Sequence, residues 1–188
     1  MKKPEAFSFH RFDRQMPDWD KAHWEFLQKL GKTFHRHSKR MTKFQLYQES
    51  LSLDDLARGF SVFFLVPLKT FPSQFIVLHF PHEFWDLFVN LLNGGQLKYQ
   101  GSPREMTVMD ESTLRPMIGD LLNDLEGCSA KSLSFLLDKC KRENSVESLR
   151  IRLGDQKLKK FEVTVEIESQ VKVTFSILYP YSTLSALG

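Results

Sequence analysis

Apolar residues recur at helical spacing directly after Pro17, and this stripe predicts the first element of the chain. Pro17, Asp18 and Asp20 favour a helix start, because proline fits the first turn and carboxylates suit the positive end of the helix dipole. One helix face is then formed by Trp19, Ala22, Phe26, Leu27, Leu30 and Phe34. Residues 1–17 show no such period and are expected to form an N-terminal arm.

Two apolar runs follow, over residues 60–68 and 75–80, and they predict strands buried on both faces. After Pro81 another helical stripe predicts a helix over residues 82–93, which the paired glycines at 94 and 95 should end. Between the first helix and these strands we expect an extended segment and a short capped helical turn. The residues that indicate them are Phe44, Leu46, Ser52, Asp55 and Gly59.

A second strong helix signal begins at Thr107, which has a capping-box partner three residues on in Asp110. The apolar face of this helix is formed by Leu114, Met117, Ile118, Leu121, Leu122 and Leu125. Pro116 lies inside the stripe and predicts a kink or a late start. Residues 128–142 are expected either to extend this helix or to form a separate one.

Apolar and polar residues alternate in the last part of the chain, which predicts three strands. We expect them over residues 149–153, 161–168 and 171–177. The last two are expected to form a hairpin with one face in the core and one polar face.

The two halves of the chain end in a similar way. FIVLHFPHEFWDLF, residues 75–88, parallels TFSILYPYSTLSAL, residues 174–187, because each has an apolar strand, a proline and a helix start. This parallel indicates an internal pseudo-repeat whose strands share one sheet. The predicted fold class is α/β, a three-layer α/β/α arrangement with a pseudo-two-fold repeat around a largely antiparallel central sheet. Residues 18–188 are expected to form one domain of two halves, 18–95 and 105–188, joined by a Gly-rich loop.

Composition supports an ordinary globular protein. Its 188 residues are 41% hydrophobic and include 17 phenylalanines, which need an interior or an interface. A net charge of +3 is too small to predict nucleic-acid binding. Cys128 and Cys140 have neither disulfide-framework nor zinc spacing, and the longest apolar run is too short to cross a bilayer. We therefore expect a soluble intracellular protein without a metal, a cofactor or a transmembrane segment.

A basic cluster marks the end of the first helix. It consists of Lys29, Lys32, His35, Arg36, His37, Lys39, Arg40 and Lys43. Two interpretations stay open, a site for an anion or acidic partner and a solvated helix face whose cations suit the helix carboxyl end. The two histidines are two residues apart and would point in different directions, so they are unsuited to a metal site.

Three stretches, in order, resemble the middle domain of the flagellar motor switch protein FliM, a relative of the CheC and CheX phosphatases. They are NLLNGG before the central loop, REMTVMDESTLRPMIGDLL after it, and ILYPYSTLSAL at the end. The likeness runs from about Phe7, where FSFHRF resembles the family's lead-in, to Leu187. The resemblance implies a CheC-like fold and a cytoplasmic, non-enzymatic scaffold of the rotor C-ring, peripheral to the inner membrane at the base of the flagellar basal body.

The resemblance also implies partners. They are the FliG rotor subunit, neighbouring copies in a ring, FliN-like switch proteins, and the response regulator CheY through a segment that does not precede Phe7 here. A SpoA-type β domain, which the family carries after this region, does not follow Gly188, so we expect a trimmed chain or a shorter paralogue. A related type III secretion ring adaptor is an alternative that differs only in its partner.

The family's GGPG-like loop contacts FliG and corresponds here to residues 93–97, with Arg104 leading into the next helix. The loop residues are Asn93, Gly94, Gly95, Gln96 and Leu97, so glutamine and leucine replace the family's proline and last glycine. Paired glycines allow a positive φ and close approach by another chain. The alternative is that they simply end a helix.

A phosphatase of the CheC class, acting on a phosphorylated response regulator, is the enzymatic alternative. The phosphatase relatives use a Glu and an Asn one helical turn apart. Glu25 with Gln28, and Asp120 with Asn123, have this spacing and lie away from the apolar stripes. Neither pair has both residue types, and water activation tolerates little error in geometry. We therefore expect no enzymatic activity.

Overall fold

The computed structural model describes residues 17–56, 59–98, 102–128 and 133–187, so most of the predicted N-terminal arm lies outside the described residues. The first half contains α1 (Pro17–Ser38), β1 (Thr42–Leu51), the 3-10 turn η1 (Leu53–Leu56), β2 (Ser61–Pro67), β3 (Phe75–Pro81) and α2 (His82–Leu92). The second half contains α3 (Val108–Glu126), the 3-10 turn η2 (Leu137–Lys139), β4 (Lys141–Glu143), α4 (Val146–Leu153), β5 (Leu158–Ile167), β6 (Val171–Pro180) and α5 (Tyr181–Leu187).

The six strands form one antiparallel sheet in the order β1-β5-β6-β3-β2-β4. The hairpins β2–β3 and β5–β6 meet at the centre, where Leu78 lies opposite Ile177. Each half supplies the edge strand beside the other half's hairpin, since β1 pairs with β5 and β4 pairs with β2. The prediction that both halves share one largely antiparallel sheet is confirmed.

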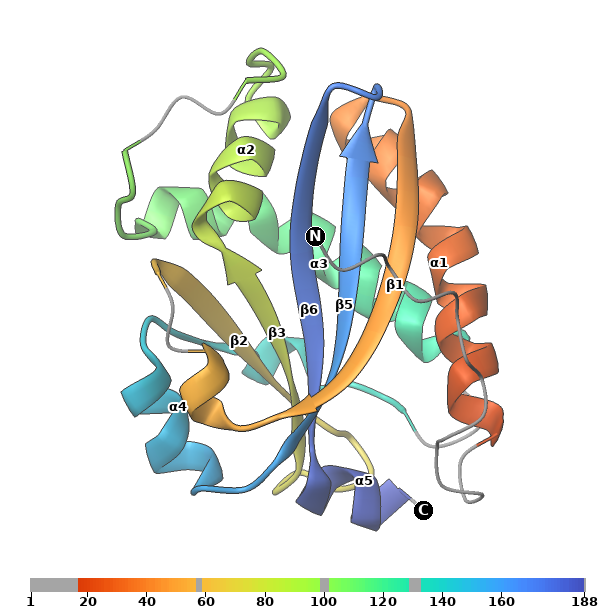
Figure 1. The fold of residues 1–188 in the computed structure, drawn as a ribbon, viewed down its shortest axis with the longest axis vertical. Helices are drawn as coiled ribbons and strands as arrows, with labels where there is room; N and C mark the ends of the chain where they lie inside the picture. Colours follow the sequence, from red (N-terminus) through yellow and green to blue (C-terminus); the bar gives the residue numbers. More distant parts are fainter. Residues whose placement is uncertain (1–16, 57–58, 99–101, 129–132, 188) are drawn as a thin grey trace, which may run out of the picture.

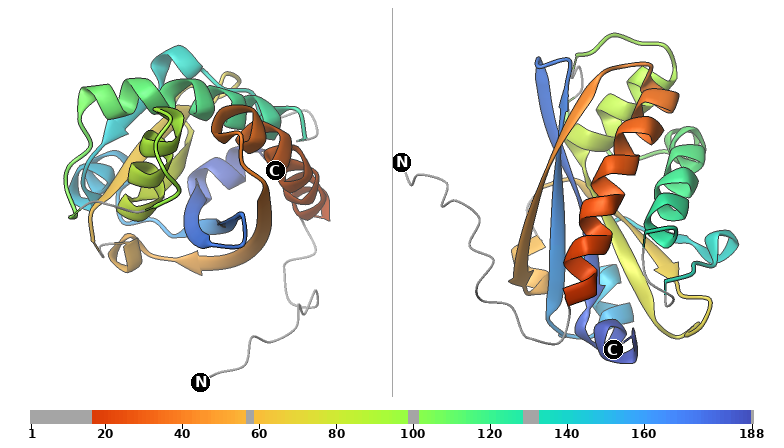
Figure 2. Two further views of the ribbon diagram at one scale, coloured as in Figure 1. Left: turned by 90° about the horizontal axis from the view of Figure 1, so that it is seen from above. Right: turned by 90° about the vertical axis from the view of Figure 1, so that its right-hand side faces the viewer.

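Helices lie on both faces of this sheet (Figures 1 and 2). On one face α1, α2 and α3 cover the larger core, to which each helix contributes fully buried side chains such as Phe26, Phe88 and Leu121. On the other face η1 and α4 enclose a smaller core around Leu65, Val77 and Leu178. The three-layer α/β/α prediction is confirmed.

The order of elements repeats from one half to the other. A helix, an edge strand, a helical turn, a hairpin and a final helix follow each other twice, with α3, β4, α4, β5–β6 and α5 repeating α1, β1, η1, β2–β3 and α2. Both hairpins end in a proline, Pro81 or Pro180, that is followed immediately by a helix. The pseudo-two-fold repeat is therefore present in the fold.

The predicted strand over residues 149–153 is wrong, because these residues belong to α4. Ser145 caps the helix by accepting a hydrogen bond from the Ser148 N–H at 3.1 Å. Leu149 and Leu153 are buried, whereas Ile151 between them is 85% exposed. A short alternation with two arginines thus fits a helix face as well as a strand. In the repeat, α4 occupies the position of η1.

The helix predicted within residues 128–142 is also wrong for the described part of that segment. α3 ends at Glu126, and from residue 133 the chain runs extended along β2 before the three-residue η2 and β4. Leu136 N–H donates to Pro67 O at 2.9 Å, and Phe135 forms a β-bridge with Leu68. These backbone bonds to β2 satisfy groups that a helix would have paired internally.

Pro116 does not delay the helix that contains it, since α3 begins at Val108 and continues to Glu126. The predicted capping box is present, with Thr107 Oγ1 accepting from Asp110 N–H at 3.2 Å and Asp110 Oδ2 accepting from Thr107 N–H at 2.8 Å. The hairpin β5–β6 differs from its prediction in one respect. From Phe175 onward β6 is buried on both faces, because it lies beside β3 at the centre of the sheet.

Candidate partner-binding loop and its supports

The loop after α2 is a helix terminus closed by backbone hydrogen bonds. Gly94 N–H donates to Leu91 O at 3.0 Å, and Gly95 N–H donates to Asn90 O at 2.8 Å. These two bonds form the Schellman motif that ends many helices with a glycine in the left-handed region. Gly94 has a φ of +79°, so a residue with a Cβ would be strained there.

Gly95 is required for a different reason, the close approach of Asn90. A Cβ on Gly95 would lie 2.0 Å from Asn90 Oδ1 and 2.8 Å from Asn90 O. The Asn90 side chain is held in this position because its Nδ2 donates to Gln96 O at 2.7 Å. The helix-stop interpretation of the two glycines therefore accounts for their backbone geometry. The loop that they form is a defined structure rather than an open connection.

The predicted loop residues differ in what they present to solvent. Asn93, Gly94 and Gln96 are exposed, and Gly95 is half-buried. Leu97 is half-buried and packs against the larger core. The leucine that replaces the family's last glycine thus anchors the loop to the protein, which leaves Asn93 and Gln96 as the side chains available to a partner.

Arg104, predicted as part of the partner site, joins α2 to the start of α3. Its Nη2 lies 3.1 Å from Asp86 Oδ1 and its Nη1 lies 2.6 Å from Asp110 Oδ2. Its guanidinium carbon also lies 4.7 Å from the ring centroid of Trp85. Its backbone N–H donates to His82 Nε2 at 3.3 Å. Arg104 is therefore a support at the base of the loop region, and its carboxylate partners are already inside the protein.

This arrangement keeps Asp110 ionised. The hydrogen bond from the Arg104 guanidinium, helped by those from Thr107, lowers the pKa of Asp110 to about 2. The same hydrogen bond raises the pKa of Arg104. The capping-box spacing predicted the role of Asp110 as a cap, whereas no local pattern indicates the contact of Arg104 with Asp86, 18 residues earlier.

The positions proposed for a phosphatase lie on α1 and α3, which pack against each other. Asp120 Oδ2 lies 2.7 Å from Arg36 Nη1 and 2.9 Å from His37 Nε2. Burial raises the pKa of Asp120, but the hydrogen bonds from His37 and Arg36 outweigh it, so that the pKa is lowered. Asp120 is thus held by α1, while its predicted companion Asn123 is exposed.

The other predicted pair, Glu25 and Gln28, lies on α1. Glu25 lies 3.9 Å from Lys21 in an ion pair one turn apart on α1, and Gln28 is exposed. Part of the basic cluster at the end of α1 is neutralised, since Arg36 contacts Asp120 and Arg40 contacts Glu168 at 3.2 Å. These contacts favour the interpretation of a solvated helix face over that of a site for an anion or acidic partner.

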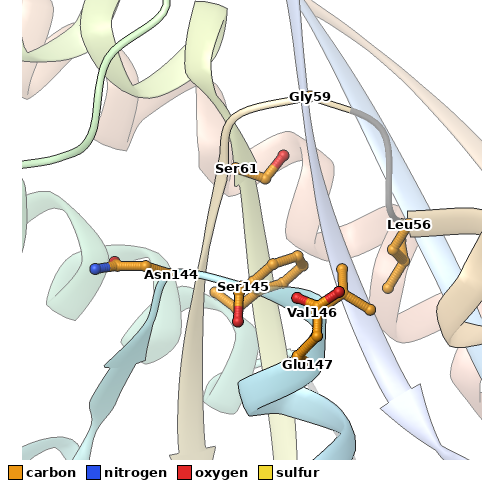
Figure 3. Close-up of a pocket in the computed structure, with 8 residues that line it drawn as sticks. Leu56, Gly59, Ser61, Asn144, Ser145, Val146 and Glu147 are labelled. Carbon is orange, nitrogen blue, oxygen red and sulfur yellow. The ribbon is translucent and has the colours of Figure 1, made fainter.

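A small cavity lies between the start of β2 and the start of α4 (Figure 3). Its volume is about 140 Å³, and it is lined by Leu56, Gly59, Ser61, Phe63, Asn144, Ser145, Val146 and Glu147. Glu147 is the single ionisable side chain in this lining. A lone carboxylate beside a hydroxyl that already caps a helix does not form a catalytic group.

Metal binding and membrane insertion can be considered for the described ranges 17–56, 59–98, 102–128 and 133–187. Within those ranges, no group of three or more His, Cys, Asp or Glu side chains is arranged to hold a metal ion. Every helix in the same ranges is either too short or too polar to cross a bilayer.

Comparison with known proteins supports the fold at low sequence identity. No family model and no curated protein matches the sequence. Among solved structures, a chain of the FliG–FliM complex from H. pylori matches with a TM-score of 0.77 and 14% identity, covering 93% of this chain and 100% of that one. The FliM middle domain of Vibrio alginolyticus matches with a TM-score of 0.70 and 12% identity, covering 90% and 97%.

A third solved structure has the same architecture. FliY of Thermotoga maritima matches with a TM-score of 0.66 and 13% identity, covering 94% of this chain and 95% of that one. The matches span nearly all of each chain, so they concern the whole sheet and its helices rather than a shared motif. The chain has the fold of a FliM middle domain.

Proposed function

We propose that this protein is a non-enzymatic scaffold of the flagellar motor switch, which binds a FliG-like rotor protein. The observation that carries the proposal is the whole-chain match to a chain of a FliG–FliM complex. The resemblance of three ordered stretches of sequence to the same family supports it independently. Under this proposal the protein lies in the cytoplasm, at the inner-membrane base of the flagellar basal body.

The loop formed by residues 93–97 is the proposed contact for the FliG-like partner. Its backbone is fixed by the Gly94 and Gly95 hydrogen bonds, so little conformational entropy would be lost on binding. Asn93 and Gln96 present exposed polar side chains beside the bare backbone of Gly94. Arg104 supports this region by joining the helices on either side of it.

Further partners follow from the same proposal. Neighbouring copies would contact the protein along its helix flanks to build a ring, and FliN-like switch proteins would join the assembly. The response regulator CheY would be a further partner of such an assembly. A type III secretion ring adaptor would share this architecture and differ in the protein that it binds.

The loop can be tested by substitutions that spare its glycines. We expect Gln96→Arg to weaken binding of the FliG homologue encoded in the same genome, measured by calorimetric titration or pull-down. Asn93→Arg is expected to act in the same way. Gln28→Arg on the outer face of α1 is the matched control, because it makes the same change at another exposed glutamine.

The outcomes separate the candidate partners and surfaces. Loss of binding in both loop variants with retention in the control supports the loop. Loss in the control alone would move the interface to α1. Failure of the unaltered protein to bind the FliG homologue, with binding to a secretion-ring component instead, would replace the flagellar assignment by that of the adaptor.

A further inference from the structure

Asn93 and Gly94 form the dipeptide in which asparagine loses its side-chain amide most readily. The chain has asparagine at positions 90, 93, 123 and 144, and glycine follows only the second of them. A glycine leaves its own backbone nitrogen unshielded, because it has no Cβ. In a flexible chain that nitrogen can attack the asparagine Cγ. Asn93 is exposed at the end of α2, where water reaches its side chain.

The reaction removes ammonia from the side chain and then adds water. The Gly94 nitrogen forms a bond to Asn93 Cγ, the bond from Cγ to Nδ2 breaks, and Nδ2 leaves as ammonia with the proton of the Gly94 N–H. Solvent water then opens the resulting five-membered imide at either of its two carbonyl carbons. One opening yields aspartate. The other yields isoaspartate, in which the backbone runs through the side-chain carbons.

The folded loop holds the reacting atoms in the wrong arrangement for this attack. Ring closure requires the Gly94 nitrogen to eclipse Asn93 Cβ about the Cα–C bond. The ψ of Asn93 is 10°, so that nitrogen nearly eclipses the backbone nitrogen of Asn93 instead. Cβ and the backbone nitrogen are separate substituents of a tetrahedral carbon. The peptide between Asn93 and Gly94 must therefore rotate far from its folded position before the ring can form.

Backbone hydrogen bonds resist this rotation. Gly94 N–H donates to Leu91 O at 3.0 Å, and this bond also engages the proton that the nitrogen must lose to become a nucleophile. The next residue is fixed as well, since Gly95 N–H donates to Asn90 O at 2.8 Å. The reactive conformation of Asn93 is therefore reached only when the end of α2 opens.

We propose that Asn93 is a site of spontaneous deamidation whose rate is set by the opening of the loop at the end of α2. In Figure 1 this loop lies beyond the upper end of α2. Helix ends open more often than the centre of a sheet, so the protection is incomplete. The amide is retained while the loop is closed and is lost during its openings.

Deamidation would change the loop in a way that favours further opening. Aspartate places a negative charge at the carboxyl end of α2, where the helix dipole is unfavourable to anions. Isoaspartate lengthens the backbone, so the hydrogen bonds from the N–H groups of Asn93 and Gly94 to α2 no longer fit their present spacing. The inference goes beyond the proposed switch function, because it concerns the chemistry of the loop whatever protein binds there.

Peptide mapping by mass spectrometry follows the reaction during incubation in mildly alkaline buffer, with and without denaturing guanidinium chloride. In denaturant we expect Asn93 to deamidate faster than the other asparagines of the chain. In buffer alone we expect Asn93 to react at least about tenfold more slowly than in denaturant, because several hydrogen bonds must break together before the ring can form.

Two variants open the loop without altering the reacting dipeptide. In Gly95→Ala the new Cβ would lie 2.8 Å from Asn90 O, and Asn90→Ala removes the bond from its Nδ2 to Gln96 O. Both should deamidate at Asn93 severalfold faster than the unaltered protein in buffer and at the same rate as it in denaturant. Gly119→Ala inside α3 is the matched control, since its Cβ has open space. Circular dichroism confirms folding, and Asn90→Ala still tests the loop where Gly95→Ala does not fold.

Four outcomes would overturn the proposal. Equal rates in buffer and in denaturant would show that the folded loop gives no protection. Faster reaction at another asparagine in denaturant would remove the dipeptide as the cause. Loop variants that react no faster than Gly119→Ala in buffer would separate the reaction from loop opening, and so would an intact Asn93 in every protein kept in buffer. The measurement needs no partner, so it can fail or succeed independently of FliG binding.

Discussion

Removing the guanidinium of Arg104 should destabilise the folded protein by about 2 kcal/mol. This group joins α2 to α3 by pairing with Asp86 and Asp110, whose partly buried charges would be unfavourable without it. The pKa of Asp110 is about 2 in the folded protein, against 3.8 for the free group. One pKa unit corresponds to about 1.4 kcal/mol, so the contacts of this carboxylate favour its charged form by about 2 kcal/mol. Thr107 supplies part of that preference, and Arg104 is 41% exposed, so water screens its share.

The share of Thr107 and the screening by water lower the destabilisation expected for Arg104→Ala, but two further losses raise it again. Arg104→Ala leaves Asp86 without its ion pair and removes the guanidinium from the face of Trp85, a contact that stabilises by about 0.5–1 kcal/mol. The net expectation stays near 2 kcal/mol. Urea unfolding followed by circular dichroism would measure it from the midpoint and slope. The control is Arg152→Ala, which breaks an exposed pair with Glu143 at 3.5 Å and should cost less than about 1 kcal/mol.

Lowering the pH gives an independent check of the cause. Since the pKa of Asp110 is lower in the folded protein than in the unfolded chain, its stabilisation is complete above about pH 4. It is lost as the pH falls toward 2, so the difference between the protein and Arg104→Ala should shrink from pH 5 to pH 3. Equal losses in Arg104→Ala and Arg152→Ala at neutral pH, or a difference that does not depend on pH, would refute the reasoning.

Three other outcomes follow from the described contacts. Gly95→Ala should destabilise the protein by at least about 1 kcal/mol, because the new Cβ would collide with Asn90 O. Gly119→Ala inside α3 has open space for its Cβ and should stabilise the protein by up to about 1 kcal/mol. Thermal unfolding of the two variants compares these effects. Burial and the charge of Lys160 lower the pKa of His79 to about 4, so the stability that its neutral form gives the folded protein is complete above about pH 6.5 and is lost toward pH 4. His79→Gln should therefore flatten the dependence of the unfolding free energy on pH in that window. An unchanged slope would contradict this. The protein should not accelerate dephosphorylation of a phosphorylated response regulator above its spontaneous rate, and an acceleration abolished by Asn123→Ala would restore the phosphatase alternative.

Local patterns predicted the elements whose signals are local. The Thr107 and Asp110 pair predicted the start of α3, and the prolines at 81 and 180 marked where two strands become helices. The error over residues 149–153 has a physical cause, since alternation over five residues also fits a helix face. The cap at Ser145 carried the missing information, together with the burial of Leu149 and Leu153.

The supports of the site could not be predicted in this way, because they join residues that are distant in the chain. Arg104 and Asp86 are 18 positions apart, and His37 and Asp120 are 83 apart. No spacing rule relates such residues before the helices are packed. The sequence therefore placed Arg104 and Asp120 at candidate sites, while the fold uses both for packing between helices.

The two glycines of the loop require a distinction between what shapes a surface and what recognises a partner. Gly94 is needed for its positive φ and Gly95 for the space that Asn90 occupies, so either would be retained in a protein that binds nothing there. Their presence cannot decide whether the loop is a docking site. Replacing them would also disturb the helix end, so a loss of binding would carry no information about contact. Recognition has to be tested at Asn93 and Gln96, whose side chains are exposed and not needed for the turn, because the bonds that hold it come from backbone atoms and from Asn90.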